Sequence, residues 1–231
     1  QTFAKFYPPP QKDLTDDKEK PSRNIFDEII KDIQALKAAL HGGATTLNMG
    51  GEMWPLPQTI ILEGMDFVRD HCVNWVLNTQ GKLHMDEFET AQGKSNPFLG
   101  WGLVAAKMEE LMMNLAFLPA VRPVNVIVTI GLDQEKKRSM VNGKAEYIET
   151  GNYDPGFGGK MSTEAPRKFR DCWLTERVAG IYCVHTAQTP KTATYRGLRS
   201  GRFGLKPTED VTLKQPFINQ WNRLFDNNVL K

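Results

Sequence analysis

A short apolar run that ends in a carboxylate, Thr59-Ile60-Ile61-Leu62-Glu63, carries the clearest chemical signal in the chain. In phosphoryl-transfer sites, a carboxylate at the C-terminal end of a buried strand holds Mg²⁺ directly or through water. We therefore predict that Glu63 is a catalytic residue and the magnesium ligand, with Asp66 one turn later as a substitute. Any buried strand that reaches solvent also tends to end in an acid, so a purely structural role stays open.

The expected companion of such a strand is a phosphate-binding loop, G-x-x-x-x-G-K-[S/T], between a strand and a helix. The nearest approach is the run Gly156-Phe157-Gly158-Gly159-Lys160-Met161, which lies far downstream of Glu63. Asp154 stands where the first glycine is needed, and Met161 stands where the hydroxyl residue is needed. The chain therefore contains no intact phosphate-binding loop.

Three arginines, Arg196, Arg199 and Arg202, follow one another closely in a glycine-rich stretch. If this stretch is a strand end and a tight turn, their guanidinium groups are placed to reach the triphosphate of a neighbouring subunit as catalytic arginine fingers. The same guanidinium groups suit contacts with DNA phosphates. A solvated hairpin tip is the structural alternative.

Composition excludes several other classes of protein. Hydrophobic residues make up 40% of the chain and charged residues 24%, which is typical of globular proteins. The net charge of +2 gives no general polyanion-binding surface. Three cysteines and four histidines lack disulfide or metal-ligand spacing, which favours a reducing, cytoplasmic location. No apolar stretch reaches the ~20 residues that a membrane span needs, so we expect no membrane partner.

The apolar periodicity up to Gly131 predicts helices and buried strands in alternation. A helix over 25–40 begins at the N-cap Asn24 and ends at Gly42-Gly43. The further elements are a strand at 59–62, a helix to about Leu77, a long helix from Asn96-Pro97 to Leu118, and a strand at 124–130. This order predicts an α/β fold with a mainly parallel sheet covered by helices.

After Gly131 the pattern changes to short strands and turns. Asn142-Gly143 between two apolar runs predicts a β-hairpin, and strands are expected at 172–178, 181–186 and 193–198. We expect these strands to form an antiparallel C-terminal extension of the sheet, followed by a helix from Pro216. Residues 1–23 are proline-rich and charged, which predicts an irregular segment, and no boundary divides 24–231 clearly into two domains.

Taken in order, these pieces resemble the phage-encoded P-loop nucleoside triphosphatases related to RecA and RadA. The matching features cover nearly the whole chain from about residue 24, although each motif is short. They are the helix at 25–40, the strand and acid at 59–63, the helix ending at 115–119, the strand at 124–129, the loop at 155–160, Phe169-Arg170-Asp171, and the stretch 198–204.

The resemblance implies a RecA-like ATPase core that acts in DNA recombination, replication or repair as a ring or filament of identical subunits. ATP and Mg²⁺ would then be the cofactors, and Glu63, Asp66 and Thr129 would bind them. Arg199 and Arg202 resemble the Lys-x-Arg finger region of that family, and Glu63 takes the place of its Walker B aspartate. The glutamate and the two-residue spacing of the arginines are departures that weigh against efficient hydrolysis.

In that family a phosphate-binding loop, its helix and a strand come first, over roughly 50–70 residues on ordinary βαβ lengths. Only 24 residues precede the first predicted helix here. We therefore expect either a piece of a longer ATPase or a variant that has lost nucleotide binding, and no unaided ATP hydrolysis by this chain. The alternative function is a non-catalytic DNA-binding, assembly or virion-associated subunit, with single-stranded DNA as its nucleic-acid partner. A phage-encoded protein would act in the host cytoplasm.

Overall fold

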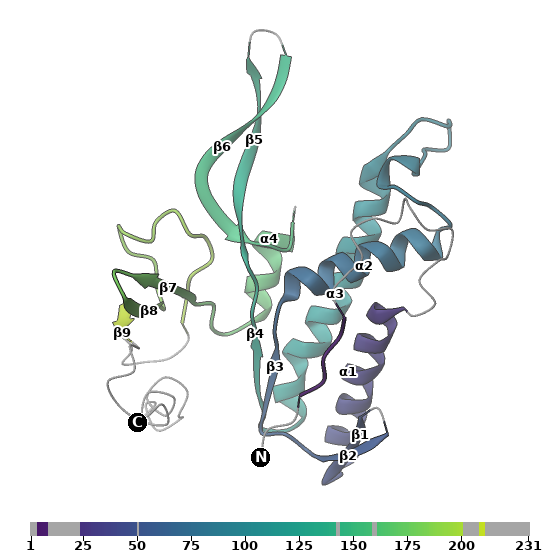
Figure 1. Cartoon of the computed structure of the whole chain (residues 1–231), viewed down its shortest axis with the longest axis vertical. Helices are drawn as coiled ribbons and strands as arrows, with labels where there is room; N and C mark the ends of the chain where they lie inside the picture. Colours follow the sequence, from purple (N-terminus) through teal and green to yellow (C-terminus); the bar gives the residue numbers. More distant parts are fainter. Residues whose placement is uncertain are drawn as a thin grey trace. The chain divides into compact units, whose positions relative to one another are not determined.

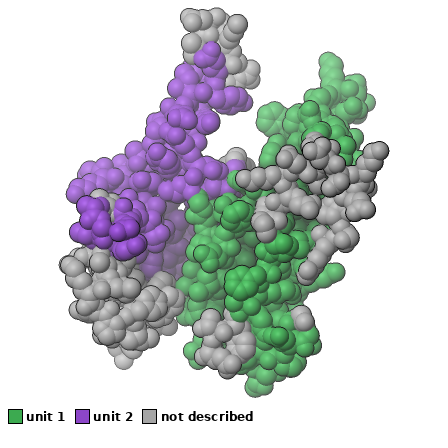
Figure 2. Space-filling view, viewed as in Figure 1, with its two compact units in different colours: residues 1–131 green, residues 132–231 purple. Residues whose placement is uncertain are grey.

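The chain divides into two compact units, Gln1–Gly131 and Leu132–Lys231 (Figures 1 and 2). The computed structural model describes residues 4–8, 24–49, 51–141, 144–158, 161–200 and 208–210. The division falls at Gly131, where the sequence changes from alternating helices and strands to hairpins. Each unit has its own set of buried apolar side chains. A single domain over 24–231 stays a prediction, because compact units of one chain can belong to one domain.

The first helix of unit 1, α1 (Ile25–His41), confirms the prediction from its spacing and caps. The Asn24 side chain accepts a hydrogen bond from the Asp27 backbone amide at 3.4 Å, and the helix ends at Gly42. Its buried side consists of Ile25, Phe26, Ile29, Ile33, Leu36 and Leu40. These positions recur at helical spacing, so one stripe of α1 faces the core of the unit.

Two further helices, α2 (Met65–Thr79) and α3 (Pro97–Val121), complete the core of unit 1, with the short helix η1 (Met85–Glu87) between them. The buried side chains of α3 are Val104, Met108, Leu111, Met112, Leu115 and Leu118. Cys72 of α2 is fully buried, and its Sγ donates to the Val104 carbonyl oxygen at 3.8 Å. Burial raises the pKa of this thiol to about 12. No helix within the described residues is both long and apolar enough to cross a bilayer.

Two small sheets lie in unit 1. Strands β1 (Thr46–Met49) and β2 (Glu52–Pro55) form an antiparallel hairpin, whereas β3 (Thr59–Leu62) and β4 (Asn125–Val128) pair in parallel. Figure 1 shows β3 and β4 side by side, joined through α2, η1 and α3. This is the helical crossover that a parallel pair requires, and it brings the carboxyl ends of both strands to one edge.

Unit 2 is built mainly from hairpins. Strands β5 (Leu132–Val141) and β6 (Lys144–Pro155) form a long antiparallel pair, which confirms the hairpin predicted around residues 142–143. Two short helices follow, α4 (Met161–Glu164) and η2 (Ala165–Lys168). Strands β7 (Leu174–Val178), β8 (Ile181–His185) and β9 (Thr208–Asp210) then form a separate antiparallel sheet. Ala179 and Gly180 connect β7 to β8, both with positive φ, as a two-residue hairpin turn requires.

The predicted RecA-like, mainly parallel sheet is wrong. Among the described residues the only parallel pair is β3 with β4, and the antiparallel strands form sheets of their own instead of extending it. An apolar run predicts a strand but not the number of its neighbours, and the Ile61 side chain, expected to be buried, is 59% exposed. Residues 193–198 form turns with an isolated bridge at Tyr195 instead of a strand. The helix predicted from Pro216 lies outside the described residues.

Candidate functional site at the carboxyl edge of β3 and β4

Three hydrogen bonds join the turn after β3 to Thr129, the first residue after β4. The Thr129 amide donates to the Leu62 carbonyl oxygen at 3.0 Å. In return, the Gly64 amide donates to the Thr129 side-chain oxygen at 3.1 Å, and the Met65 amide donates to the Thr129 carbonyl oxygen at 2.9 Å. The edge of this small sheet is therefore a fixed connection between two segments that lie far apart in the sequence.

Gly64 allows the strand to lead directly into α2. Its φ of 74° lies in the left-handed region, which a residue with a side chain rarely adopts. A Cβ at this position would also lie 2.9 Å from Cδ2 of the Phe67 ring. The sharp turn places Asp66 in the first turn of α2, where the positive end of the helix dipole favours a carboxylate.

Glu63, Asp66 and Thr129, which the sequence singled out, lie together at this edge. Glu63 and Thr129 are exposed, and Asp66 is half-buried. Asp66 Oδ2 points toward the chain that leaves β4, because it lies 3.9 Å from the place that a Cβ on Gly131 would occupy. Glu63 and Thr129 thus directly follow the two parallel strands, and Asp66 lies in the first turn of α2. Their roles as ligands stay predictions.

The oxygen ligands at this edge suit Mg²⁺, which proteins commonly bind through one or two carboxylates, water and substrate phosphates. Across the described ranges, no group of three or more His, Cys, Asp or Glu side chains is placed to hold a metal ion. A magnesium site at this edge, with Glu63 and Asp66 as its two carboxylates, stays a prediction. Gly159 and Lys160, from the run nearest to a phosphate-binding loop, lie outside the described residues.

The triplet Gly93-Lys94-Ser95, which was not among the sequence predictions, matches the last three positions of the phosphate-binding loop motif and precedes α3. Phe88 stands where the first glycine would be needed. The Gly93 amide already donates to the Thr90 carbonyl oxygen at 2.9 Å, and the Lys94 amide donates to the Thr90 hydroxyl at 3.4 Å. Because these amides are in use within the turn, the triplet does not form a phosphate cradle.

Arg199, a predicted arginine finger, is half-buried within unit 2. Its Nη2 donates to the backbone carbonyl oxygens of Pro166 and Phe169. Its own amide and carbonyl exchange hydrogen bonds with Cys172 at 2.9 and 2.8 Å. These contacts fasten the turn at 165–169 to the start of the next sheet. Arg202 lies outside the described residues, so the finger role of both arginines stays a prediction.

Arg196, the remaining arginine of that stretch, belongs to a polar cluster at the base of the β5–β6 hairpin. Glu135 Oε2 accepts hydrogen bonds from the Thr150 hydroxyl at 2.6 Å, the Asn152 side-chain amide at 3.0 Å, and Arg196 Nη2 at 2.8 Å. The bonds from Thr150 and Asn152, followed by Arg196, lower the pKa of Glu135 to about 2. Tyr195, the residue before Arg196, stacks on Tyr153, with the two ring centres 5.3 Å apart. The cluster ties the hairpin to the segment before Arg199.

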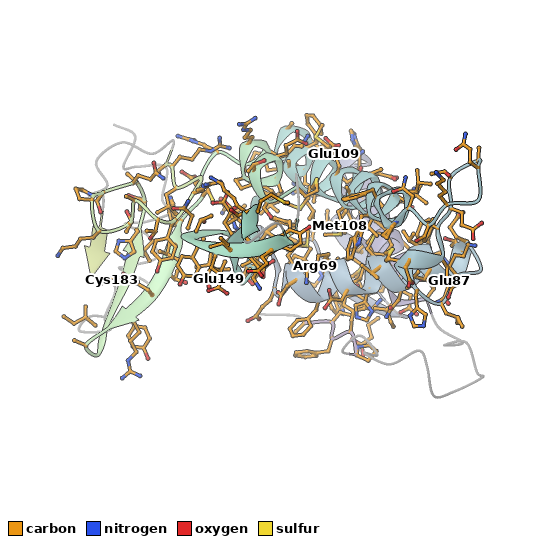
Figure 3. All side chains as sticks on the ribbon, turned by 90° about the horizontal axis from the view of Figure 1, so that it is seen from above. Arg69, Glu87, Met108, Glu109, Glu149 and Cys183 are labelled. Carbon is orange, nitrogen blue, oxygen red and sulfur yellow. The ribbon has the colours of Figure 1, made fainter. Side chains whose placement is uncertain are left out.

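Beyond this base, the β5–β6 hairpin projects away from the rest of its own unit (Figure 2). Tyr147 is 72% exposed, and Lys136 and Lys137 are exposed as well. Lys136 Nζ lies 3.9 Å from an oxygen of Glu149, which Figure 3 labels, and both side chains remain open to solvent. The hairpin thus offers basic and aromatic side chains on a narrow ribbon.

No protein-family model, curated protein or solved structure matches this chain. The resemblance to RecA-type nucleoside triphosphatases therefore rests on the order of short motifs in the sequence. The residues at the carboxyl edge of β3 and β4 and the exposed hairpin are the structural features that bear on function.

Proposed function

We propose that this chain is the core of a magnesium- and ATP-dependent protein that acts on DNA in recombination, replication or repair, as an oligomer of identical subunits. The observation that carries the proposal is that the turn after β3, which contains Glu63 and leads to Asp66, is hydrogen-bonded to Thr129 at the carboxyl edge of β3 and β4. Open α/β sheets bind their ligands at this edge. The order of the sequence motifs adds the link to ATP and to DNA.

Each of the three residues has a distinct task in this proposal. The exposed Glu63 carboxylate holds Mg²⁺ directly or through water, and Asp66 is the second carboxylate within the same turn. The Thr129 oxygen already accepts a hydrogen bond from the Gly64 amide at 3.1 Å. Its hydroxyl proton remains available for a phosphate oxygen or for the attacking water.

The direct test is ATP turnover by the full-length gene product with and without Mg²⁺. Glu63→Gln keeps the size of the side chain and removes its charge, so we expect turnover to fall by about 100-fold or more. Glu89→Gln, at an exposed glutamate elsewhere in unit 1, is the matched control and should leave turnover unchanged. Unchanged turnover in Glu63→Gln, or no ATP binding by the full-length product, would overturn the enzymatic proposal.

A second candidate is a DNA-binding subunit without catalysis, and the exposed β5–β6 hairpin favours it. Two-stranded ribbons fit the major groove of duplex DNA, and exposed aromatic rings stack on the bases of single strands. Lys136 and Tyr147 supply a positive charge and a ring on one face of the ribbon, and Lys137 supplies a positive charge on the other face. Because the chain carries a net charge of only +2, DNA binding needs local positive charge of this kind.

Gel-shift titrations with single-stranded DNA over a range of salt concentrations test this candidate. Lys136→Ala/Lys137→Ala should weaken binding and lower the slope of log affinity against log salt by about 0.7 for each lost phosphate contact. Lys94→Ala, at an exposed lysine of unit 1, is the matched control. Arg199→Ala is a poor probe, because this side chain holds two backbone carbonyls. Absence of binding at every salt concentration would eliminate the candidate.

A further inference from the structure

The helix α3 is apolar on its outer side as well as on its buried side. Seven positions form a line along the outer side, which we call the outer stripe: Leu99, Leu103, Ala106, Glu110, Met113, Phe117 and Ala120. Phe117 is 53% exposed and Leu103 is 42% exposed. A helix whose outer side faced only solvent would carry polar residues on that side. The stripe therefore has the composition of a contact surface.

The spacing of the outer stripe is that of a coiled-coil seam. Its positions are separated alternately by four and three residues from Leu99 to Ala120. This alternation is the a/d repeat that brings two helices together along a narrow line. The stripe runs for about 32 Å at 1.5 Å per residue, which is nearly the full length of α3.

The centre of the stripe carries both signs of charge. Glu110 is the charged member of the stripe, and Lys107 lies beside it one turn earlier, with Nζ 2.8 Å from Glu110 Oε2. Lys107 Nζ also lies 5.5 Å from the centre of the Trp75 ring, which fixes it at the border of the stripe. A single polar position within an apolar seam typically specifies how two helices align.

We propose that the outer stripe of α3 binds the same stripe of a second copy of this chain, with the two helices antiparallel and the two-fold axis crossing the stripe between Ala106 and Glu110. In this register Glu110 lies opposite Ala106 of the second copy and next to its Lys107. Leu103 lies opposite Met113 and Leu99 lies opposite Phe117, so apolar residues meet on both sides of the charged centre. A parallel alignment would instead set Glu110 against the second Glu110, and like charges oppose each other there.

Such a contact is isologous, because both copies use the same surface and each contact occurs twice. The contact specifies an interface for the oligomer in the proposed function, and it rests on the proposed function only through that oligomer. Sedimentation measures association without ATP or DNA. A failure of the dimer therefore leaves the magnesium-nucleotide proposal standing, and a failure of ATP binding leaves the dimer standing.

The first test is sedimentation velocity of the full chain over a concentration series. The native chain should form dimers, and Leu103→Asp/Phe117→Asp should shift it to monomer. Leu83→Asp, at a leucine that is 58% exposed outside the stripe, is the matched control and should leave the dimer intact. Circular dichroism checks that the helices persist, and Phe117→Ser replaces the double variant if it fails to fold. A monomer at every concentration, or a dimer unaffected by the stripe variants, overturns the proposal.

The second test addresses the charged centre and the direction of the helices. Glu110→Lys alone and Lys107→Glu alone should each weaken the dimer, and a mixture of the two variants should restore it as a mixed pair. Oxidation of a mixture of Leu103→Cys and Met113→Cys chains should then link the two unlike chains, with the native chain as the control for its own cysteines. Linkage of Leu103→Cys chains only to each other, or no recovery in the charge mixture, overturns the antiparallel arrangement.

Discussion

Unit 1 and unit 2 are each stabilised by a different kind of internal contact. In unit 1 the three helices bury a large set of apolar side chains, and Met108, labelled in Figure 3, is one that is almost inaccessible to water. In unit 2 polar contacts join distant segments, such as Glu135 Oε2 with Arg196 Nη2 at 2.8 Å and Arg199 Nη2 with the Pro166 carbonyl oxygen. The apolar contacts of unit 1 tolerate small shifts, whereas each polar contact of unit 2 depends on one particular partner.

Because the internal contacts of the two units differ, a substitution has a different structural consequence in each unit. Removal of an apolar side chain from unit 1 leaves a cavity that the surrounding helices close only in part. Removal of one polar partner from unit 2 leaves the other partner partly buried without its hydrogen bond, which lowers the free energy of unfolding further. The two units should therefore respond differently to substitution and to acid.

The largest effect is expected for Leu115→Ala in the core of unit 1. This side chain on α3 is 1% exposed, so its truncation should lower the free energy of unfolding by about 2–5 kcal/mol. Chemical denaturation followed by circular dichroism measures the loss, since the helices lie in unit 1. Leu83→Ala, at an exposed leucine, should stay within about 0.5 kcal/mol of the native chain. Equal losses for the two variants would show that α3 does not form the core.

A smaller loss, confined to unit 2, is expected for Arg199→Met. The substitution removes the donor for the Pro166 and Phe169 carbonyl oxygens and should cost about 1–3 kcal/mol. Hydrogen exchange should speed up at the Cys172 amide, which bonds to Arg199, and stay unchanged in α1. Arg167→Met, at an exposed arginine of the same turn, is the control. Faster exchange in both units would mean that they unfold together.

The smallest effects are expected in acid, where unit 1 should weaken at a higher pH than unit 2. Burial lowers the pKa of His71 from its ordinary 6.5, against smaller opposing effects of the Pro8 carbonyl oxygen and Asp70. The unfolded chain therefore binds the proton first, and the stability due to neutral His71 is lost as the pH falls below about 6.5.

The corresponding group in unit 2 is Glu135, whose folded pKa of about 2 lies below its ordinary value of 4.5. Its contribution is complete above pH 4.5 and is lost between about 4.5 and 2. Hydrogen exchange at a series of pH values, corrected for intrinsic rates, separates the two units. His71→Asn should flatten the first transition, and Glu135→Gln should flatten the second. One shared transition would contradict the assignment of each group to its own unit.

The sequence located the three helices and strands β3 and β4 of unit 1 because their signals are local, but it missed the β1–β2 hairpin. The spacing of apolar residues located α1 and α3, and the N-cap Asn24 and the Asn96-Pro97 pair located their starts. That the turn after β3 lies beside Thr129 followed from the same reasoning, since the carboxyl ends of neighbouring parallel strands share an edge. The number of strands in the sheet did not follow, because an apolar run looks the same with one neighbour as with two.

The contacts of unit 2 could not be predicted, because they join residues whose separation carries no pattern. Glu135 and Arg196 are 61 positions apart in the sequence, and neither belongs to a motif that points to the other. Arg199 was predicted to be an arginine finger because of its positive charge near a turn. Its bonds to two backbone carbonyls depend on how the chain folds back at 165–169. Periodicity locates elements, whereas a specific ion pair appears only once they have been assembled.

The buried thiol of Cys72 makes the opening of unit 1 observable without any added label. Its pKa of about 12 and its complete burial keep the reactive thiolate scarce while the unit is closed. Burial also raises the pKa of Cys172, which lies in unit 2 beside Arg199. Because Cys172 is partly exposed, only Cys72 reports opening: the rate at which a thiol reagent modifies Cys72 measures how often unit 1 exposes its interior.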